Sequence, residues 1–175
     1  PRYISAAHSL CENIANRKVL LENLQDEENM DGDHPKLWRN FAFAVGSNKK
    51  EIESVKEEKF TTQLIENFFK HARASYAEGL GSLYTYERQI PEIAETKIKG
   101  LKNHFGVSSK EGLEFFEVHK SADVYHRQAC EKLLDGLSVE EQDKAEKSAL
   151  STAKYLWNFL TGMAVKYNIP AQVAA

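Results

Sequence analysis

Apolar residues recur every three or four positions along most of the chain, with charged and polar residues between them. The first segment shows this spacing at Tyr3, Ala6, Leu10 and Ile14. It places the apolar side chains on one face of an α-helix, whereas the alternating β-branched runs typical of strands are nearly absent. The pattern predicts an all-α protein with seven main helices, and a short helix plus loop over residues 47–60. The main helices are expected at about residues 2–15, 17–29, 34–46, 61–81, 82–105, 109–136 and 138–167.

Glycine and proline mark several of the expected helix boundaries. We expect the fourth helix to end near Gly79 and Gly81, because glycine is enriched just past helix C-termini. Pro91 lies inside the fifth helix and should kink it, since proline removes one backbone hydrogen bond. Ser138 and Glu141 have the spacing of a capping box, which predicts that the last helix starts there.

The length and charge of the chain suit a single globular domain over residues 1–175. A net charge of -3 gives no electrostatic reason to expect binding to nucleic acid or to an anionic membrane. No apolar run reaches the roughly 18 residues that a membrane-spanning helix needs, and the cysteine content does not suggest a disulfide framework. We therefore expect a cytoplasmic protein. The chain opens at Pro1 without an initiator methionine, immediately before helical periodicity, so we also expect an N-terminal segment to be missing.

The most informative chemical pattern is His119-x3-Asp123-x2-His126, in the sixth predicted helix. At about 100° per residue, these three positions fall within roughly 60° of one another on one helix face. Two imidazoles and one carboxylate are the ligands of the facial triad of non-haem iron proteins. By itself the pattern also fits a polar helix face with two solvated histidines, so the spacing does not decide between these interpretations.

Three more residues of ligand type lie where the helical pattern allows a shared site. Glu27 and His34 lie on the two sides of a tight turn, and Glu87 is flanked by tyrosines and apolar residues. A carboxylate on an apolar helix face is costly unless it is paired or binds a metal ion. With the helical motif, these residues supply three histidines and three carboxylates, a set that suits two first-row metal ions. From spacing alone, Glu27 also fits an exposed acidic run, and His34 an ordinary helix start.

Several motifs of the chain belong together. They are Asp26-Glu27-Glu28-Asn29, His34, Leu37-Trp38, Tyr84-x-Tyr86-Glu87-x-Gln89-Ile90-Pro91 and His119-x3-Asp123-x2-His126. In combination they resemble one branch of the haem-oxygenase-like helical proteins, a superfamily that includes the TenA thiaminases and PqqC. The branch is the group similar to the chlamydial protein associating with death domains. The resemblance runs from the first residues to the sixth predicted helix and weakens in the seventh.

The resemblance implies a seven-helix, TenA/PqqC-like bundle with metal ligands at Glu27, His34, Glu87, His119, Asp123 and His126. It implies two iron ions, or iron and manganese, that activate dioxygen. The implied reaction makes p-aminobenzoate for folate synthesis by oxidative cleavage of a tyrosine of the protein itself. Lys97 matches the lysine implicated in supplying the amino group, and Tyr86 matches a tyrosine of the site. From the residues alone, Lys97 also fits a solvated helix lysine, and Tyr86 fits ordinary core packing.

Two departures from the resemblance leave other functions open. Phe115 stands where the chlamydial protein has a tyrosine, and the resemblance implies that the tyrosine that is consumed lies on an N-terminal helix, in the segment that we expect to be missing. One alternative is a dimetal or PqqC-like oxidoreductase that acts on an external fatty acid, amino acid or cofactor precursor. An apolar tunnel lined by Phe68, Phe69 and Phe116 would favour it. Another alternative is a helical protein-interaction module. We expect a homodimer and an external reductant, which the sequence does not identify.

Overall fold

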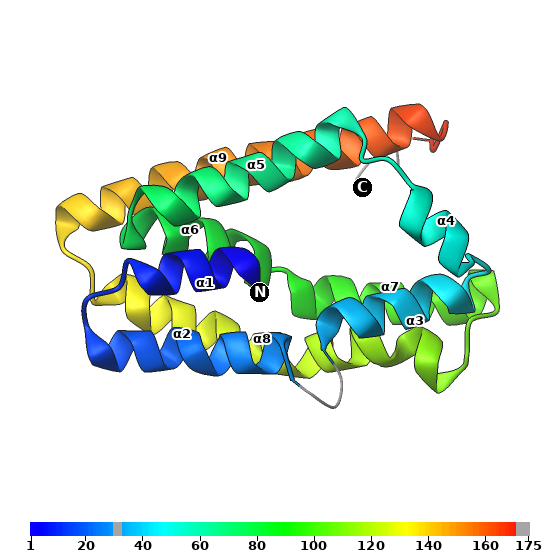
Figure 1. Cartoon of the computed structure of the whole chain (residues 1–175), viewed down its shortest axis with the longest axis horizontal. Helices are drawn as coiled ribbons and strands as arrows, with labels where there is room; N and C mark the ends of the chain where they lie inside the picture. Colours follow the sequence, from blue (N-terminus) through cyan, green and yellow to red (C-terminus); the bar gives the residue numbers. More distant parts are fainter. Residues whose placement is uncertain (30–32, 171–175) are drawn as a thin grey trace.

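The computed structural model describes residues 1–29 and 33–170. Within these ranges the chain forms nine α-helices and no strand, which confirms the all-α fold class (Figure 1). No helix in the described part of the chain is long and apolar enough to cross a membrane. The helices are α1 (Arg2–Ser9), α2 (Ile14–Glu27), α3 (His34–Ala44), α4 (Lys49–Ser54), α5 (Lys59–Ala74), α6 (Tyr76–Glu87), α7 (Ile90–Phe105), α8 (Lys110–Asp135) and α9 (Val139–Lys166).

The helices form two groups that meet where α6 packs against α8. On one side α5 and α9 run next to each other and both pack on α6 (Figure 1). On the other side α3 and α7 pack on α8, which is one of the two longest helices described. The short helix α1 contacts α2, α5 and α6, and α2 also contacts α8. Helices from both groups therefore pack on α8, which carries three of the six predicted metal ligands.

The predicted fifth helix is divided at Arg88 and Gln89, so the prediction of one kinked helix is wrong. Helix α6 ends at Glu87, and α7 begins at Ile90 with Pro91 in its first turn. Proline suits the first turn of a helix because its missing N–H would have no intrahelical partner there. The break leaves Glu87 on the last turn of α6 instead of in the middle of a long helix.

The expected helix end at Gly79 and Gly81 is also wrong, because both glycines lie inside α6. Helix α5 already ends at Ala74, and Ser75 caps α6 by accepting a hydrogen bond from the Glu78 N–H. A Cβ atom on Gly81 would lie 2.1 Å from the Ala145 carbonyl oxygen, and one on Gly79 would lie 2.8 Å from the Ala7 Cβ. These glycines thus allow α6 to approach α9 and α1 closely. The capping box predicted at Ser138 and Glu141 is confirmed.

Two apolar clusters fix the position of α8. The larger joins α1, α2, α6 and α8, and its buried members are Ile4, Leu20, Leu80, Leu83, Cys130 and Leu133. The smaller joins α7 and α8 through Ala94, Ile98 and Phe116. Burial of apolar surface is the main favourable term in folding, so these contacts hold α8 against the helices that supply the other ligand-type residues.

Candidate metal centre

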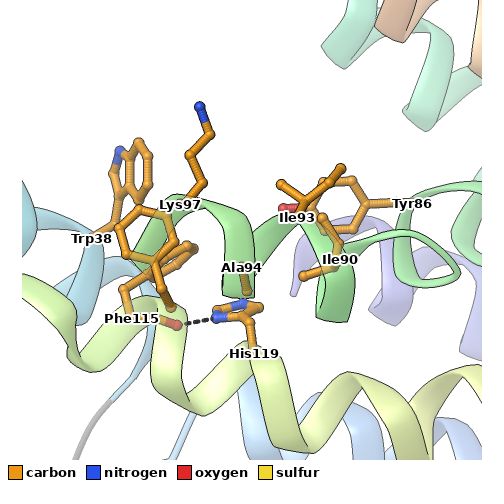
Figure 2. A pocket seen from close by; sticks show the side chains of 9 residues that line it. Trp38, Tyr86, Ile90, Ile93, Ala94, Lys97, Phe115 and His119 are labelled. Carbon is orange, nitrogen blue, oxygen red and sulfur yellow. Dashed lines mark hydrogen bonds between the residues drawn. The ribbon is translucent and has the colours of Figure 1, made fainter. Parts of the chain in front are cut away.

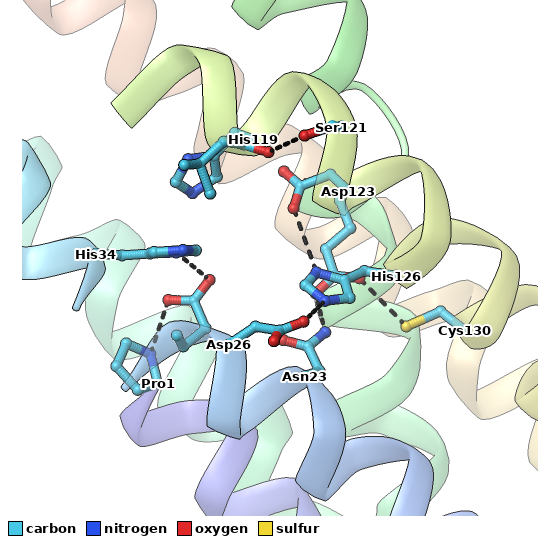
Figure 3. Close-up of polar contacts among 12 residues, drawn as sticks. Pro1, Asn23, Asp26, His34, His119, Ser121, Asp123, His126 and Cys130 are labelled. Atoms are coloured by element: carbon cyan, nitrogen blue, oxygen red, sulfur yellow. Dashed lines mark hydrogen bonds and ion pairs between the residues drawn. The ribbon is translucent and has the colours of Figure 1, made fainter. Parts of the chain in front are cut away.

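Helix α8 buries all three residues of its polar motif on one face, as the helical spacing predicts. His119, Asp123 and His126 are each no more than 4% exposed, and their side chains lie on the side of α8 that faces α2 and α3 (Figure 3). Three ionisable groups on one buried helix face are costly unless other groups compensate them. The interpretation as a solvated polar face is therefore wrong.

One group of ligand-type side chains consists of Glu27, His34 and His119. Each offers one ligand atom, and these atoms lie within 4.8 Å of one another. The His34 Nδ1 is 2.9 Å from the Glu27 Oε1, and the His34 and His119 ring centroids are 4.4 Å apart. Glu27 ends α2 and His34 begins α3, so three helices meet at this group. Two histidines and one carboxylate match the facial-triad ligand set.

A second group consists of Glu87, Asp123 and His126. The His126 Nδ1 is 3.3 Å from the Asp123 Oδ1, and the charges of His126 and Asp123 both act on the pKa of the buried Glu87. This group is less compact than the first, which alone in the described part of the chain has its ligand atoms within 4.8 Å. Asp123 connects the two groups, because its charge also acts on the pKa of His119.

Buried atoms without hydrogen bonds show that a metal ion fits these side chains. The His34 Nδ1, the Asp123 Oδ2 and the His126 Nδ1 are buried and make no hydrogen bond. The two nitrogens do face carboxylate oxygens, as given above, but without the geometry of a hydrogen bond. A buried polar atom with no partner is costly. All three atoms belong to predicted ligands, and coordination to a cation would satisfy each of them.

The protonation of Glu27 and His119 also suits metal binding in the first group. Burial lowers the pKa of His119 below its usual value, which favours the neutral imidazole that a metal needs. The His119 Nδ1 lies 2.6 Å from the Phe115 carbonyl oxygen, so its proton is held there and the Nε2 keeps its lone pair. Burial on its own would raise the pKa of Glu27, but the close contact with the His34 Nδ1 and the charge of His34 lower it below its usual value.

The second group holds protons more tightly. Burial raises the pKa of Glu87 to about 7, although a hydrogen bond from Asn23 opposes the shift. Burial would lower the pKa of His126, but the close contact with Asp123, a hydrogen bond to Asp26 and the charge of Glu87 raise it to about 9. Without a metal ion, this group therefore binds a proton on His126 that a cation would have to displace.

Two tyrosines lie near both groups. The charges of Asp123, Glu27 and Glu87 act on Tyr86, and burial together with these charges raises its pKa above the usual value. Tyr86 was predicted as a tyrosine of the site. Sequence reasoning assigned Tyr3 only to a helix face, yet burial, Tyr86 and the same three carboxylates raise its pKa too. Both hydroxyls therefore stay protonated at neutral pH.

An apolar pocket of about 280 Å³ opens beside His119 (Figure 2). Phe115 forms part of its wall and packs on the His119 ring, with centroids 4.1 Å apart. Lys97 lies at the edge of the pocket, is exposed, and points its amine away from His119. Of the three phenylalanines considered for an apolar tunnel, Phe116 lines this pocket, whereas Phe68 and Phe69 do not. The pocket is lined by Trp38, Tyr86, Ile90, Ile93, Ala94, Lys97, Phe115, Phe116 and His119.

Sequence reasoning missed three residues that contact the predicted ligands. Asn23 and Cys130 contact Glu87, and Asp26 contacts His126. Asn23, Asp26 and Glu27 have the spacing of one helix face, and this signal could have identified the first two. No sequence signal connects Cys130 with Glu87, since they are 43 residues apart on different helices.

An all-α fold that buries histidines and carboxylates in one place defines a helical non-haem metalloprotein. The chain belongs to the family of iron-containing redox enzymes, which it matches over residues 1–157. It is therefore an iron-binding oxidoreductase, and the resemblance to the haem-oxygenase-like helical proteins is confirmed.

Curated relatives point to one group within this family. The chain is 37% identical to a 4-aminobenzoate synthase of Chlamydia muridarum, over 91% of this chain and 68% of the relative. It is 37% identical to the 4-aminobenzoate synthase of Chlamydia trachomatis serovar D, over 91% and 70%. It is 32% identical to that of Nitrosomonas europaea, over 95% and 73%.

Proposed function

We propose that the protein is a dinuclear iron, or iron/manganese, oxidase that uses dioxygen to make 4-aminobenzoate by cleaving one of its own tyrosines. The observation that carries the proposal is the meeting of six ligand-type residues from four helices at one buried place. The names of the relatives support the product, because 4-aminobenzoate synthesis is what those proteins are said to perform.

In this proposal each group of side chains holds one ion. Glu27, His34 and His119 would bind one, and the three ligands of the second group, Glu87, Asp123 and His126, would bind the other. Bound iron supplies one-electron redox chemistry and the activation of dioxygen. Three carboxylates offset most of the charge of two divalent ions, so the pair can be buried.

Side chains around the ligands have separate tasks. The Tyr86 hydroxyl keeps its proton, and Tyr86 lines the pocket beside His119, so it would be the tyrosine side chain available to donate an electron to bound iron. Phe115 and Trp38 pack edge to face, with centroids 4.8 Å apart, and shield His119 from water. Lys97 would supply the nitrogen. Its exposed amine must rotate toward the pocket for that step, and its long flexible stem allows this.

A second candidate function is oxidation of an external small molecule at the same centre. The pocket beside His119 favours it, because ligand sites are concave, mostly apolar and carry few polar groups. Tyr86, Lys97 and His119 are the polar members of this lining.

A homodimer and a cytoplasmic location are also proposed. Exposed Trp157 and Leu150 on one face of α9 support the dimer, which light scattering tests, and free Cys11 and Cys130 fit a reducing compartment.

The experiment that tests the proposed function follows product and protein mass together. Protein loaded anaerobically with iron is exposed to dioxygen, and 4-aminobenzoate and the intact chain are measured by mass spectrometry. We expect no more than about one product per chain, with a matching loss of mass at a tyrosine. Lys97→Arg should reduce product at least about tenfold because arginine cannot donate its nitrogen in the same way.

Lys99→Arg is the matched control, since Lys99 lies on the same helix and pairs with Glu95 at 3.0 Å instead of lining the pocket. It should behave like the unchanged protein. Product formed with an intact chain, or only after a small molecule is added, would contradict the self-cleaving reaction and favour the external substrate.

A further inference from the structure

Helix α2 brings more than one ligand to the metal centre. Asn23, Asp26 and Glu27 lie at positions i, i+3 and i+4 of this helix, so they share one face. Glu27 is a predicted ligand, whereas the other two contact predicted ligands from α6 and α8. One face of α2 therefore contacts members of both ligand groups (Figure 3).

The carboxylate of Glu87 is held at both oxygens by neutral donors. The Asn23 Nδ2 donates to the Glu87 Oε1 at 2.6 Å. The Cys130 Sγ lies 3.5 Å from the Glu87 Oε2, within the range of a thiol hydrogen bond. All three side chains are buried, with exposures of 5% or less. Two donors on opposite oxygens fix the rotation of the carboxylate and still leave one lone pair on each oxygen for a cation.

The imidazole of His126 is oriented in a similar way by Asp26. The His126 Nε2 lies 3.0 Å from the Asp26 Oδ2, and the opposite nitrogen, Nδ1, is buried, makes no hydrogen bond and faces Asp123. A carboxylate that accepts the Nε2 proton leaves the lone pair on the Nδ1. His126 would then bind through its Nδ1, whereas His119, whose Nδ1 is held by a carbonyl, would bind through its Nε2.

We propose that Asn23, Cys130 and Asp26 are positioning residues of the metal centre, which orient Glu87 and the Nδ1 of His126 toward the second ion. The inference rests on the ligand set of the proposed function. Outer partners of metal ligands fix their orientation, and their loss commonly weakens metal binding about 10–100-fold.

The test is an anaerobic titration of the metal-free chain with Co²⁺, whose visible absorption bands report the ligand geometry, and with Mn²⁺. We expect the unchanged protein to bind two ions. Asn23→Ala and Asp26→Ala should each lower the affinity for one of the two ions about 10–100-fold and shift the Co²⁺ bands. The affinity for the other ion should change little. Asp26→Asn keeps an acceptor for the Nε2 proton, so its metal affinity should fall less than that of Asp26→Ala.

Cys130 is tested by a pair of variants. Cys130→Ala removes the donor to Glu87 and should lower the affinity for the same ion by a smaller factor, because a thiol is a weak donor. Cys130→Ser keeps a donor and should restore binding. The controls are Gln25→Ala, an exposed position on α2, and Cys11→Ala, a buried cysteine whose Sγ donates to the Asn13 carbonyl oxygen. Circular dichroism of the metal-free proteins compares their folds.

Wild-type dissociation constants and Co²⁺ bands in Asn23→Ala and Asp26→Ala would overturn the inference. An equal loss of affinity for both ions would also overturn it, since that result indicates general loosening of the fold. Fewer than two ions in the unchanged protein would overturn the dinuclear centre as well, whereas two ions with unaffected variants would overturn this inference alone.

Discussion

His119, Glu87 and His126 differ in how tightly each holds the proton that a metal ion must displace. Burial lowers the pKa of His119, so its imidazole is already neutral at pH 7. Burial raises the pKa of Glu87 to about 7. Against the effect of burial, Asp123, Asp26 and Glu87 raise the pKa of His126 to about 9. Protons therefore compete with metal ions at Glu87 and His126 of the second group more than at His119 of the first.

Metal affinity of the second group should rise with pH. Between pH 7 and pH 9, where His126 is protonated in the metal-free protein, each pH unit should raise the affinity about tenfold. Below pH 7, where Glu87 is protonated too, the slope should approach about a hundredfold per unit. Calorimetry in buffers of different ionisation enthalpy measures the protons released. Affinity that stays constant from pH 6 to pH 9, with no proton release, would contradict these assignments.

At the scale of helices, glycine determines how closely α6 approaches α9. Gly81 lies where any Cβ would meet the backbone of Ala145 at 2.1 Å, a contact that a side-chain rotation cannot relieve. Sequence patterns treat glycine as a helix end, because close packing between distant segments leaves no local signal. For this reason the helical periodicity was predicted, but the boundary between α5 and α6 was not. The break before Pro91 was not predicted either, because a proline within a helical pattern is compatible with both a kinked helix and a divided one.

Gly81→Ala should destabilise the protein by about 1–3 kcal/mol, the usual cost of overpacking a core, because α6 must move away from α9. Gly100→Ala is the matched control. Gly100 lies inside α7 with nothing within 4 Å of its added Cβ, so this change should stabilise by about 0.5–1 kcal/mol. Urea denaturation measures both values. Equal effects of the two changes would contradict the close packing of α6 on α9.

At the scale of the whole molecule, the metal centre is assembled from elements that lie far apart in the sequence. The motif on α8 was predictable from helical spacing, since one helix supplies His119, Asp123 and His126. Glu27 and His34 were supported as ligands only by the resemblance, and Glu87 also by its position on an apolar helix face, because spacing cannot show that different helices meet. The contacts of Asn23, Asp26 and Cys130 were not predicted at all. They depend on how α2, α6 and α8 pack in three dimensions.

The central claim is that this fold holds two metal ions, and metal analysis of anaerobically purified protein tests it most directly. Elemental analysis with Mössbauer spectroscopy should find two ions per chain, both iron or one iron and one manganese. His126→Ala should lose at least one of them while Gln25→Ala keeps both, because only His126 faces the ligand group at Asp123. One ion or none in the unchanged protein, or an unchanged stoichiometry in His126→Ala, would contradict the dinuclear centre.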